Sequence, residues 1–412
     1  MIDDTYPPLA VWLYDERVAD LHFDGVRGAH LTYTPAAVDR YGVNGLALSA
    51  SLPVRRERYR SDQTAPYLDR LLPEGAARSL LEREFRVPRG DTFHLLEALG
   101  RDCAGAVVII DADDAPPAQS GEPLTLTDDD VAARIDELPA HPLGVDEQVR
   151  LSLAGMQAKL LVTELASGTF ALPVAGAPST HIIKPAIEGF AGVCANEAWC
   201  LALARHAGLP AATAAVRGFG DRDALVVTRY DRVREDGVLR RVHQEDACQA
   251  LGTPLPAKYE ADDGGPTLER IAGVVRRLAV DPVEQLERLA AYVTFTVAIG
   301  NADFHGRNVS LLYSRDGPQV APLYDAICTV VYDSVTSTLA MRVGGAEAID
   351  AVTADDVVTE VAGWHLPRAR AADLVGATLE RLRAAVEPAT AAMPEARPVA
   401  AVVRERIDGL LG

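Results

Sequence analysis

The chain has 412 residues, of which 48% are hydrophobic and 24% are charged, so we expect a globular protein of two or three domains. Its net charge of −19 repels nucleic-acid phosphates and argues against DNA binding by the chain alone. Five scattered cysteines without a CxxC pair indicate free thiols rather than a zinc site. Without a signal-peptide pattern or a membrane-length apolar run, we expect a soluble cytoplasmic protein.

The first 145 residues mix short strands with helices and predict an N-terminal α+β subdomain. Expected strands cover 9–14, 18–23, 31–34, 45–49 and 107–111, and an apolar helical pattern covers 67–84. A stretch rich in Pro, Asp and Gly at 111–123 indicates a surface loop. Thr127 is the expected N-cap of the following helix, because acidic residues fill its first turn.

Residues 146–235 are rich in expected strands, whereas residues 236–412 are mostly helical. Strand patterns cover 150–164, 168–174, 179–185 and 223–232, with a helix at 196–206 that ends before Gly208. Loops and short strands interrupt the helical part at 300–345. A strand-rich lobe followed by a helix-rich lobe favours an α+β, protein-kinase-like two-lobed fold. Residues 146–235 are then the N-lobe and 236–412 the C-lobe.

The most informative segment is AIGNADFHGRNVSLLY at 298–313. Asp303 and Asn308 are five residues apart, as are the Asp and Asn of a kinase catalytic loop. Phosphoryl transfer needs a carboxylate to accept the proton of the attacking hydroxyl, which suits Asp303. It also needs an oxygen ligand for magnesium, which suits Asn308. The competing interpretation is a loop of ordinary Asx turns.

The two apolar runs that follow predict a β-hairpin. NVSLLY and QVAPLY are separated by a turn signal at Asp316-Gly317. Because a hairpin brings the chain back, we expect Asp325, just beyond the second run, to lie beside Asn308. A carboxylate and an amide held together form a magnesium site, with Asp325 as the second metal-binding residue.

Upstream segments supply candidate nucleotide contacts. Lys184 ends the strand STHIIKP, where a lysine can neutralise nucleotide phosphates, and a partner for it is Glu197 on the next helix. SLAGMQAKL at 152–160 combines small residues with Lys159 and indicates a phosphate loop. Backbone groups of 228–230 can pair with an adenine edge. The alternatives are a surface lysine, a helix-favouring glutamate and ordinary strand ends.

HQEDACQALG at 243–252 begins with helix-capping chemistry and continues into an apolar face. We interpret it as structural. Gln244, Glu245 and Asp246 are expected to brace the lobe beneath the catalytic loop, and His243 is expected to be a packed histidine rather than a ligand.

Together these segments resemble the HipA family of serine/threonine kinases, toxins of HipBA toxin–antitoxin modules. The matching stretches are SLAGMQAKL, HIIKP, NEAWCLALARHAGLP, TRYDR, HQEDACQALG, GNADFHGRN and PLYD, in the family's order over roughly 145–330. The resemblance implies Asp303 as catalytic base, Asn308 and Asp325 as magnesium ligands, and Ser152 as a self-phosphorylated serine whose modification shuts off activity. The implied nucleotide-binding residues are Ala154, Gly155, Met156, Gln157, Ala158, Lys159, Lys184, Thr228, Arg229, Tyr230, His305, Gly306, Arg307, Asn308, Tyr324 and Asp325. Arg307 stands where the family more often has lysine.

The resemblance also implies cofactors and partners. ATP and Mg²⁺ are the expected cofactors, and a HipB-like helix-turn-helix antitoxin is the expected partner, through which the acidic chain would contact DNA. The implied substrate is a protein hydroxyl, typically on an aminoacyl-tRNA synthetase. Two alternatives stay open: a small-molecule phosphotransferase with the same fold, and a pseudokinase that serves as a co-repressor scaffold.

Overall fold

The structure is a computed structural model, and it describes residues 6–114, 124–143, 152–153, 157–173, 177–314 and 317–412. The chain separates into two compact units. The first comprises 1–185, 218–222 and 229–245, and the second comprises 186–217, 223–228 and 246–412. The expected boundary at 145 falls inside the first unit, and the three-part division of the chain stays a prediction.

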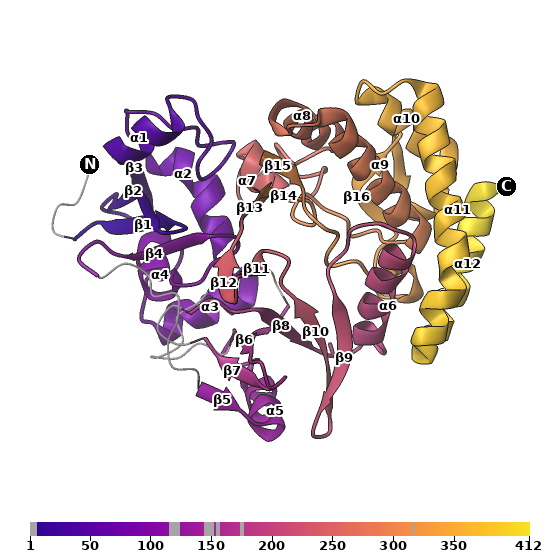
Figure 1. The fold of residues 1–412 in the computed structure, drawn as a ribbon, viewed down its shortest axis with the longest axis horizontal. Coiled ribbons are helices and arrows are strands. Elements are labelled where there is room, and N and C mark those ends of the chain that lie inside the picture. Colours follow the sequence, from indigo (N-terminus) through magenta and orange to yellow (C-terminus); the bar gives the residue numbers. More distant parts are fainter. Residues whose placement is uncertain (1–5, 115–123, 144–151, 154–156, 174–176, 315–316) are drawn as a thin grey trace. The chain divides into compact units, whose positions relative to one another are not determined.

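The N-terminal part of the first unit is a four-stranded antiparallel sheet with helices (Figure 1). Its strands are β1 (Leu9–Leu13), β2 (Glu16–Phe23), β3 (Ala29–Tyr33) and β4 (Val107–Asp111), in the order β3-β2-β1-β4. The helices are α1 (Pro35–Tyr41), α2 (Ser61–Leu68), η1 (Asp69–Leu71), α3 (Gly75–Glu84) and α4 (Thr92–Leu99). Burial alternates along β2 and β3, as expected for strands with one face on a core.

Two sequence-based expectations for this part were wrong. Residues 45–49 do not form a strand: Gly45 lies in a turn, where a β-carbon would stand 1.9 Å from the Tyr41 carbonyl oxygen, and Leu48 fills the core from the loop. The helix over 67–84 is broken between α2 and α3. Leu72 is extended before Pro73, and Gly75 has a φ of +58°, so neither position continues a helix.

The rest of the first unit contains short strands and one helix. These elements are β5 (Leu124–Leu126), α5 (Asp128–Glu137), β6 (Leu160–Glu164), β7 (Phe170–Leu172), β8 (His181–Pro185), β11 (Arg232–Glu235), β12 (Val238–Arg241) and β13 (His243–Asp246), whose last residue belongs to the second unit. Strands β5, β7, β6 and β8 are hydrogen-bonded in that order, and all three pairings are antiparallel. Thr127 caps α5 in a capping box with Asp130, as expected.

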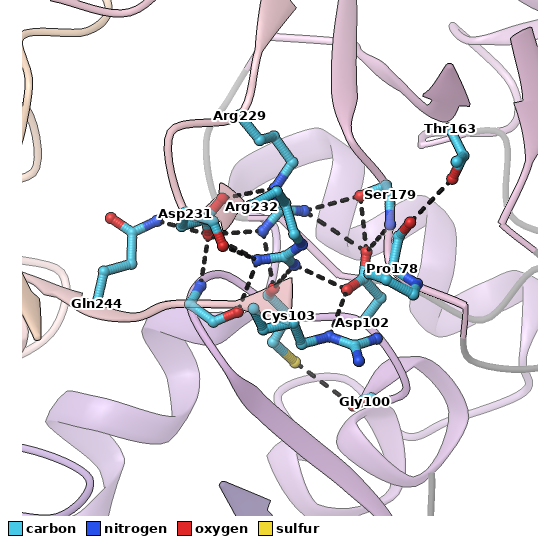
Figure 2. Close-up of polar contacts among 12 residues, drawn as sticks. Gly100, Asp102, Cys103, Thr163, Pro178, Ser179, Arg229, Asp231, Arg232 and Gln244 are labelled. Carbon is cyan, nitrogen blue, oxygen red and sulfur yellow. Dashed lines mark hydrogen bonds and ion pairs between the residues drawn. The ribbon is translucent and has the colours of Figure 1, made fainter. Parts of the chain in front are cut away.

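A buried ion cluster joins distant parts of the first unit (Figure 2). Asp102 pairs with Arg232 at 2.8 Å and with Arg241 at 3.3 Å, and Asp231 pairs with Arg229 at 2.8 Å. The cluster also holds backbone, because the Asp231 carboxylate accepts the Gly105 N–H. These contacts attach the residues before β4 to the segment around β11, more than one hundred residues later.

The second unit is mainly helical. Its helices are α6 (Val193–His206), α7 (Ala247–Leu251), α8 (Leu268–Leu278), α9 (Pro282–Ile299), α10 (Ala354–Gly363), α11 (Arg368–Ala392) and α12 (Arg397–Leu411), with 3-10 turns η2 (Thr329–Val331), η3 (Ile349–Ala351) and η4 (Pro394–Ala396). The strands are β9 (Ala214–Phe219), β10 (Arg222–Thr228), β14 (Ser310–Ser314), β15 (Gly317–Val320), β16 (Thr338–Val343) and β17 (Ala346–Ala348); the tip of the β9–β10 hairpin belongs to the first unit. Helix α11 packs against α6, α9, α10 and α12 (Figure 1).

Helix α9 is the centre of this unit, because nearly all of its residues from Leu286 to Ile299 are buried. A helix that is apolar all round belongs inside a core, and its carboxyl end positions the loop that follows. Among the described residues, no helix combines the length and the apolar character needed to cross a membrane.

Candidate active site

The loop that carries Asp303 begins at the end of α9. Gly300 ends the helix with a φ of +70°, and a β-carbon there would lie 2.6 Å from Val330 and 2.9 Å from Arg406. The Asn301 side chain then accepts the Asp303 N–H at 3.0 Å. A glycine end and an Asx turn thus set the backbone of Asp303, whose side chain is exposed to solvent.

The expected approach of Asn308 and Asp325 is confirmed. Strands β14 and β15 form an antiparallel hairpin with Ser314 opposite Gly317. Past the end of this hairpin, the Asn308 amide nitrogen donates to the Asp325 carboxylate at 2.9 Å. Asp325 has a φ of +55°, a conformation that is uncommon for a residue other than glycine and is concentrated at functional sites.

The Asn308–Asp325 pair fits a magnesium ion by its chemistry. Mg²⁺ prefers hard oxygen ligands, and it usually keeps several waters rather than an all-protein shell. Asp325 supplies a carboxylate, and the Asn308 side-chain oxygen, although it accepts the His305 N–H at 3.0 Å, has a second lone pair. One carboxylate and one amide oxygen are sufficient for a metal shared with nucleotide phosphates.

Arg307 and Tyr324 brace the loop. The Arg307 guanidinium pairs with Asp246 at 3.1 Å, and Asp246 also caps α7, so Asp246 supports the loop of Asp303 and Asn308 as expected. The Tyr324 hydroxyl donates to the Arg307 carbonyl oxygen at 2.5 Å and contacts the Ser310 hydroxyl at 2.7 Å. Both predicted nucleotide contacts are therefore tied into the scaffold by their own hydrogen bonds.

The expected role of Gln244 and Glu245 was wrong. Glu245 is buried and binds the Ser49 hydroxyl at 2.5 Å and the Ala50 N–H at 2.9 Å. Gln244 donates to Asp231 at 3.0 Å. Both side chains thus hold the first unit together, because a strand alternates its faces and only long-range folding decides what each face meets. His243 is packed as expected, with Nε2 2.8 Å from the Leu48 carbonyl oxygen.

The predicted phosphate-binding lysines lie in the first unit. Leu160 on β6 pairs with Ile183 on β8, so the same register places Lys159 opposite Lys184. Opposite residues share one face of a sheet, and both lysines are more than 90% buried. Two ammonium groups placed in this way match the negative charge of nucleotide phosphates. Ala158 precedes Lys159, and the Gln157 amide donates to the Pro185 carbonyl oxygen at 3.3 Å. Residues 154–156 of the predicted phosphate loop lie outside the described residues.

The predicted adenine hinge is occupied by internal contacts. The N–H groups of Thr228 and Arg229 donate to the carbonyl oxygens of Thr213 and Thr180. The Arg229 side chain lies in the buried ion cluster, and the Tyr230 hydroxyl donates to the Gln244 amide oxygen. The contact between residues 228–230 and adenine stays a prediction. Backbone groups would have to make this contact, because the Arg229 side chain is held in the ion cluster.

Ser152, the predicted phosphorylation site, is fully buried. Its hydroxyl donates to the Leu71 carbonyl oxygen at 2.6 Å, and its N–H donates to the Asp102 carbonyl oxygen at 2.9 Å. In this arrangement the Ser152 hydroxyl is buried in the core and donates a hydrogen bond to Leu71. It can therefore receive a phosphoryl group only if residue 152 leaves this position.

Two residues beside the catalytic loop were missed by sequence reasoning. Lys258 and Tyr259 both contact His305, two residues after Asp303, from a segment more than forty residues earlier in the chain. The sequence offered little signal, because a Lys-Tyr pair among Pro, Asp and Gly residues is typical of any surface loop.

Comparison with known proteins identifies relatives over nearly the whole chain. The profile described as the HipA-like C-terminal domain matches residues 151–389, and that of the HipA N-terminal domain matches residues 9–110. A Sinorhizobium fredii protein named "Putative kinase Y4mE" is 39% identical over 93% of both chains. The Shewanella oneidensis "Serine/threonine-protein kinase toxin HipA" is 29% identical over 87% of this chain and 84% of that one.

The fold has a solved counterpart. A chain of the Shewanella oneidensis MR-1 toxin–antitoxin complex of HipA, HipB and its operator DNA matches with a TM-score of 0.83 and 27% identity. The match covers 98% of this chain and 96% of that chain. The expected α+β, kinase-like fold class is thereby confirmed.

Proposed function

This chain belongs to the HipA family of kinase toxins, and from this premise we propose that it is an ATP-dependent serine/threonine-protein kinase that acts as the toxin of a toxin–antitoxin pair. The observation that carries the proposal is the loop of Asp303 and Asn308, with Asp325 hydrogen-bonded to Asn308 at 2.9 Å. An exposed carboxylate next to an amide–carboxylate pair is the arrangement that phosphoryl transfer to a hydroxyl requires.

Each residue type matches one part of the proposed reaction. Asp303 orients the acceptor hydroxyl and takes its proton. Asn308 and Asp325 would hold Mg²⁺, which when bound neutralises charge on the nucleotide phosphates. The paired lysines 159 and 184 supply two positive charges for the phosphates from neighbouring strands. Residues 228–230 are the proposed adenine contact.

Self-phosphorylation of Ser152 is the proposed means of inactivation. A phosphoserine carries close to two negative charges at neutral pH and three acceptor oxygens. The Ser152 hydroxyl lies 2.6 Å from the Leu71 carbonyl oxygen, which is a hydrogen-bond acceptor. A phosphate group at this place would need hydrogen-bond donors instead. Modification would therefore keep residue 152 out of its buried position and disturb the adjoining phosphate loop.

The proposed partner is a HipB-like helix-turn-helix antitoxin. The solved relative is a complex of HipA, HipB and operator DNA, and the net charge of −19 favours DNA contact through a partner rather than through this chain. The proposed acceptor is a protein hydroxyl, with an aminoacyl-tRNA synthetase as the substrate that family resemblance implies.

The test is the intact mass of the dephosphorylated chain before and after incubation with Mg-ATP, followed by peptide mapping. We expect a gain of one phosphate at Ser152. Asp303→Ala should lower the transfer rate at least 100-fold, since general bases contribute about 10²–10⁴-fold. The matched control is Asp333→Ala, which removes an exposed aspartate eight residues after Asp325 and should leave the rate unchanged.

Other outcomes separate the alternatives. ATP binding without transfer to Ser152, but with transfer to a protein acceptor, would keep the kinase and remove self-inactivation. Turnover of sugars or aminoglycosides without any protein acceptor would indicate a small-molecule phosphotransferase. A chain that assembles with its antitoxin on operator DNA and binds no ATP would be a pseudokinase scaffold, and the proposal would fail.

A further inference from the structure

The chain that follows Asp325 returns to the start of the catalytic loop. Thr329 begins the 3-10 turn η2, and its hydroxyl donates to the Gly300 carbonyl oxygen at 3.0 Å. The same hydroxyl accepts the Ala302 N–H at 2.8 Å. The Thr329 N–H also donates to the Gly300 carbonyl oxygen, at 3.2 Å. Thr329 therefore holds the peptide groups that lead from the end of α9 to Asp303.

The backbone of Ala302 depends on this hydroxyl. Ala302 is 2% exposed, and its carbonyl oxygen accepts the Ala340 N–H at 2.8 Å, so Thr329 and Ala340 hold it from two sides. A buried N–H without a hydrogen-bond partner is unfavourable, so the backbone should move if the hydroxyl is removed and movement gives the N–H a new partner. Asp303 is the next residue, so a shift of Ala302 would move the candidate base directly.

The segment from Asp325 to Thr329 holds the catalytic loop at two places. At one end of the segment, Asp325 accepts the Asn308 amide at 2.9 Å. At the other end, Thr329 holds the start of the loop. Asp303 lies between these two attachments in the chain. This short segment therefore sets the separation between the candidate base and the proposed magnesium ligands.

Asn196 on α6 holds the same segment in place. Its amide oxygen accepts the Cys328 N–H at 2.9 Å, and its amide nitrogen donates to the Cys328 carbonyl oxygen at 3.0 Å. Asn196 is fully buried, so this contact is shielded from water. Because both polar backbone groups of Cys328 are paired with one side chain, the next residue, Thr329, has a fixed position.

We propose that Thr329 is a positioning residue of the kinase site, which keeps the base Asp303 at a fixed distance from the proposed magnesium ligands; the inference rests on the proposed function. In the transfer, the acceptor hydroxyl gives its proton to Asp303 and its oxygen bonds to the γ-phosphorus. The bond from that phosphorus to the β–γ bridging oxygen breaks, and ADP leaves with the electron pair. Asp303 holds the acceptor and the ligand pair holds the nucleotide, so their separation decides whether the reacting atoms meet.

Substitutions of Thr329 test whether its hydroxyl has this role. Transfer of labelled phosphate from Mg-ATP to the chain itself and to dephosphorylated casein is measured for the wild type, Thr329→Ser, Thr329→Ala and Thr329→Val. Thr329→Ser keeps the hydroxyl and should retain most of the wild-type rate. Thr329→Ala and the isosteric Thr329→Val should each lower kcat about 10- to 100-fold, because a misplacement of about 1 Å costs about 100-fold. The KM for ATP should stay unchanged, because the effect is on Asp303.

A double-mutant cycle and a control variant separate positioning from packing. In the Asp303→Ala background, Thr329→Ala should cause no further loss of the residual rate, because Thr329 acts through Asp303. The matched control is Thr294→Val, which removes a buried hydroxyl that donates to the Ala290 carbonyl oxygen at 2.8 Å within α9. It should change the melting temperature and leave kcat and KM unchanged.

The outcomes are distinguishable. A wild type that transfers no phosphate to either acceptor refutes the kinase function and the inference with it. If the wild type is active and Asp303→Ala disables it, full activity of Thr329→Ala and Thr329→Val refutes only the inference. An equal loss in Thr329→Ser, or a loss as large in the Asp303→Ala background, also refutes it. So does a raised KM with unchanged kcat, or unfolding of both hydroxyl-free variants at the assay temperature, because Thr329 would then act on ATP binding or on folding.

Discussion

The buried ion cluster of the first unit makes the sharpest prediction about stability. Asp102 is the carboxylate that three arginines share: Arg232 at 2.8 Å, Arg241 at 3.3 Å and Arg229 at 3.5 Å. It also accepts the Ser179 hydroxyl at 2.7 Å. The perturbation is Asp102→Asn, which keeps the shape of the side chain, removes its charge and turns one acceptor into a donor.

The size of the effect follows from the surroundings. The Asp102 side chain is 2% exposed, so the guanidinium groups that lose their partner cannot turn to solvent. The cluster holds three arginines and two aspartates, so its net charge is +1. In Asp102→Asn only Asp231 remains as a carboxylate, and the net charge of the cluster rises to +2. Removing one partner of a buried ion pair costs about 3–5 kcal/mol, so we expect a loss of that size in the free energy of unfolding.

Hydrogen exchange locates the loss, because the two units can be read separately. Peptides from β1 and β4 report on the first unit, and peptides from α9 and α11 report on the second. Asp102→Asn should accelerate exchange in β1 and β4 by at least about 100-fold, which corresponds to about 3 kcal/mol. The matched control is Asp355→Asn, which breaks an ion pair with Arg368 whose side chains are 77% and 54% exposed, and it should cost under about 1 kcal/mol.

The stability that the cluster contributes should also depend on pH. Burial raises the pKa of Asp102, but Arg232 and Arg229 outweigh it and hold that pKa at about 2. The cluster's contribution is therefore complete above the ordinary carboxyl pKa near 3.8 and is lost as the pH falls through about 2. If hydrogen exchange in β1 and β4 is equally fast in Asp102→Asn and Asp355→Asn, the reasoning is refuted. Arginines left buried without a carboxylate would then not lower the stability of the first unit.

Three further predictions concern single residues. Burial lowers the pKa of His243 to about 4. The neutral His243 therefore contributes fully to the free energy of unfolding above pH 6.5, and up to about 3 kcal/mol of that free energy is lost as the pH falls towards 4. In His243→Gln, the free energy of unfolding measured with urea should depend less on pH between 6.5 and 4. Gly300→Ala should lower the melting temperature and the kinase rate, because its φ of +70° and the contact with Val330 cost about 1–3 kcal/mol; a wild-type melting curve would contradict this. Asp325→Asn should raise the Mg²⁺ concentration for half-maximal activity about 10-fold or more without changing thermal stability, and an unchanged Mg²⁺ titration would remove Asp325 from the metal site.

Local patterns made much of the candidate site predictable. The five-residue spacing from Asp303 to Asn308 and the hairpin signal at Gly317 depend on residues near in sequence, and their geometry is set by turns and strand pairing. The same holds for the cap at Thr127 and for Lys184 at the end of β8. Where both partners of an interaction lie within about twenty residues, the chain has few ways to arrange them.

Other features depended on residues far apart in the chain. Gln244 and Glu245 were assigned to the catalytic loop, yet Glu245 binds Ser49, which is 196 residues away. Nothing in the local pattern distinguishes a polar strand residue that meets a buried hydroxyl from one that meets a loop. Residues 67–84 show the opposite error, because a helical apolar pattern outweighed the Pro73 signal that breaks it.

The sequence by itself determined the family resemblance, the α+β kinase-like fold class, and the loop from Asp303 to Asn308 with its hairpin, since these follow from spacing and turn chemistry. Only the tertiary structure decided that Lys258 and Tyr259 lie on that loop, that Ser152 is buried against Leu71, and that Arg229 belongs to an ion cluster. The physical reason is that a buried polar group must find a partner wherever the fold supplies one, and the partner's identity is a property of the whole packed chain.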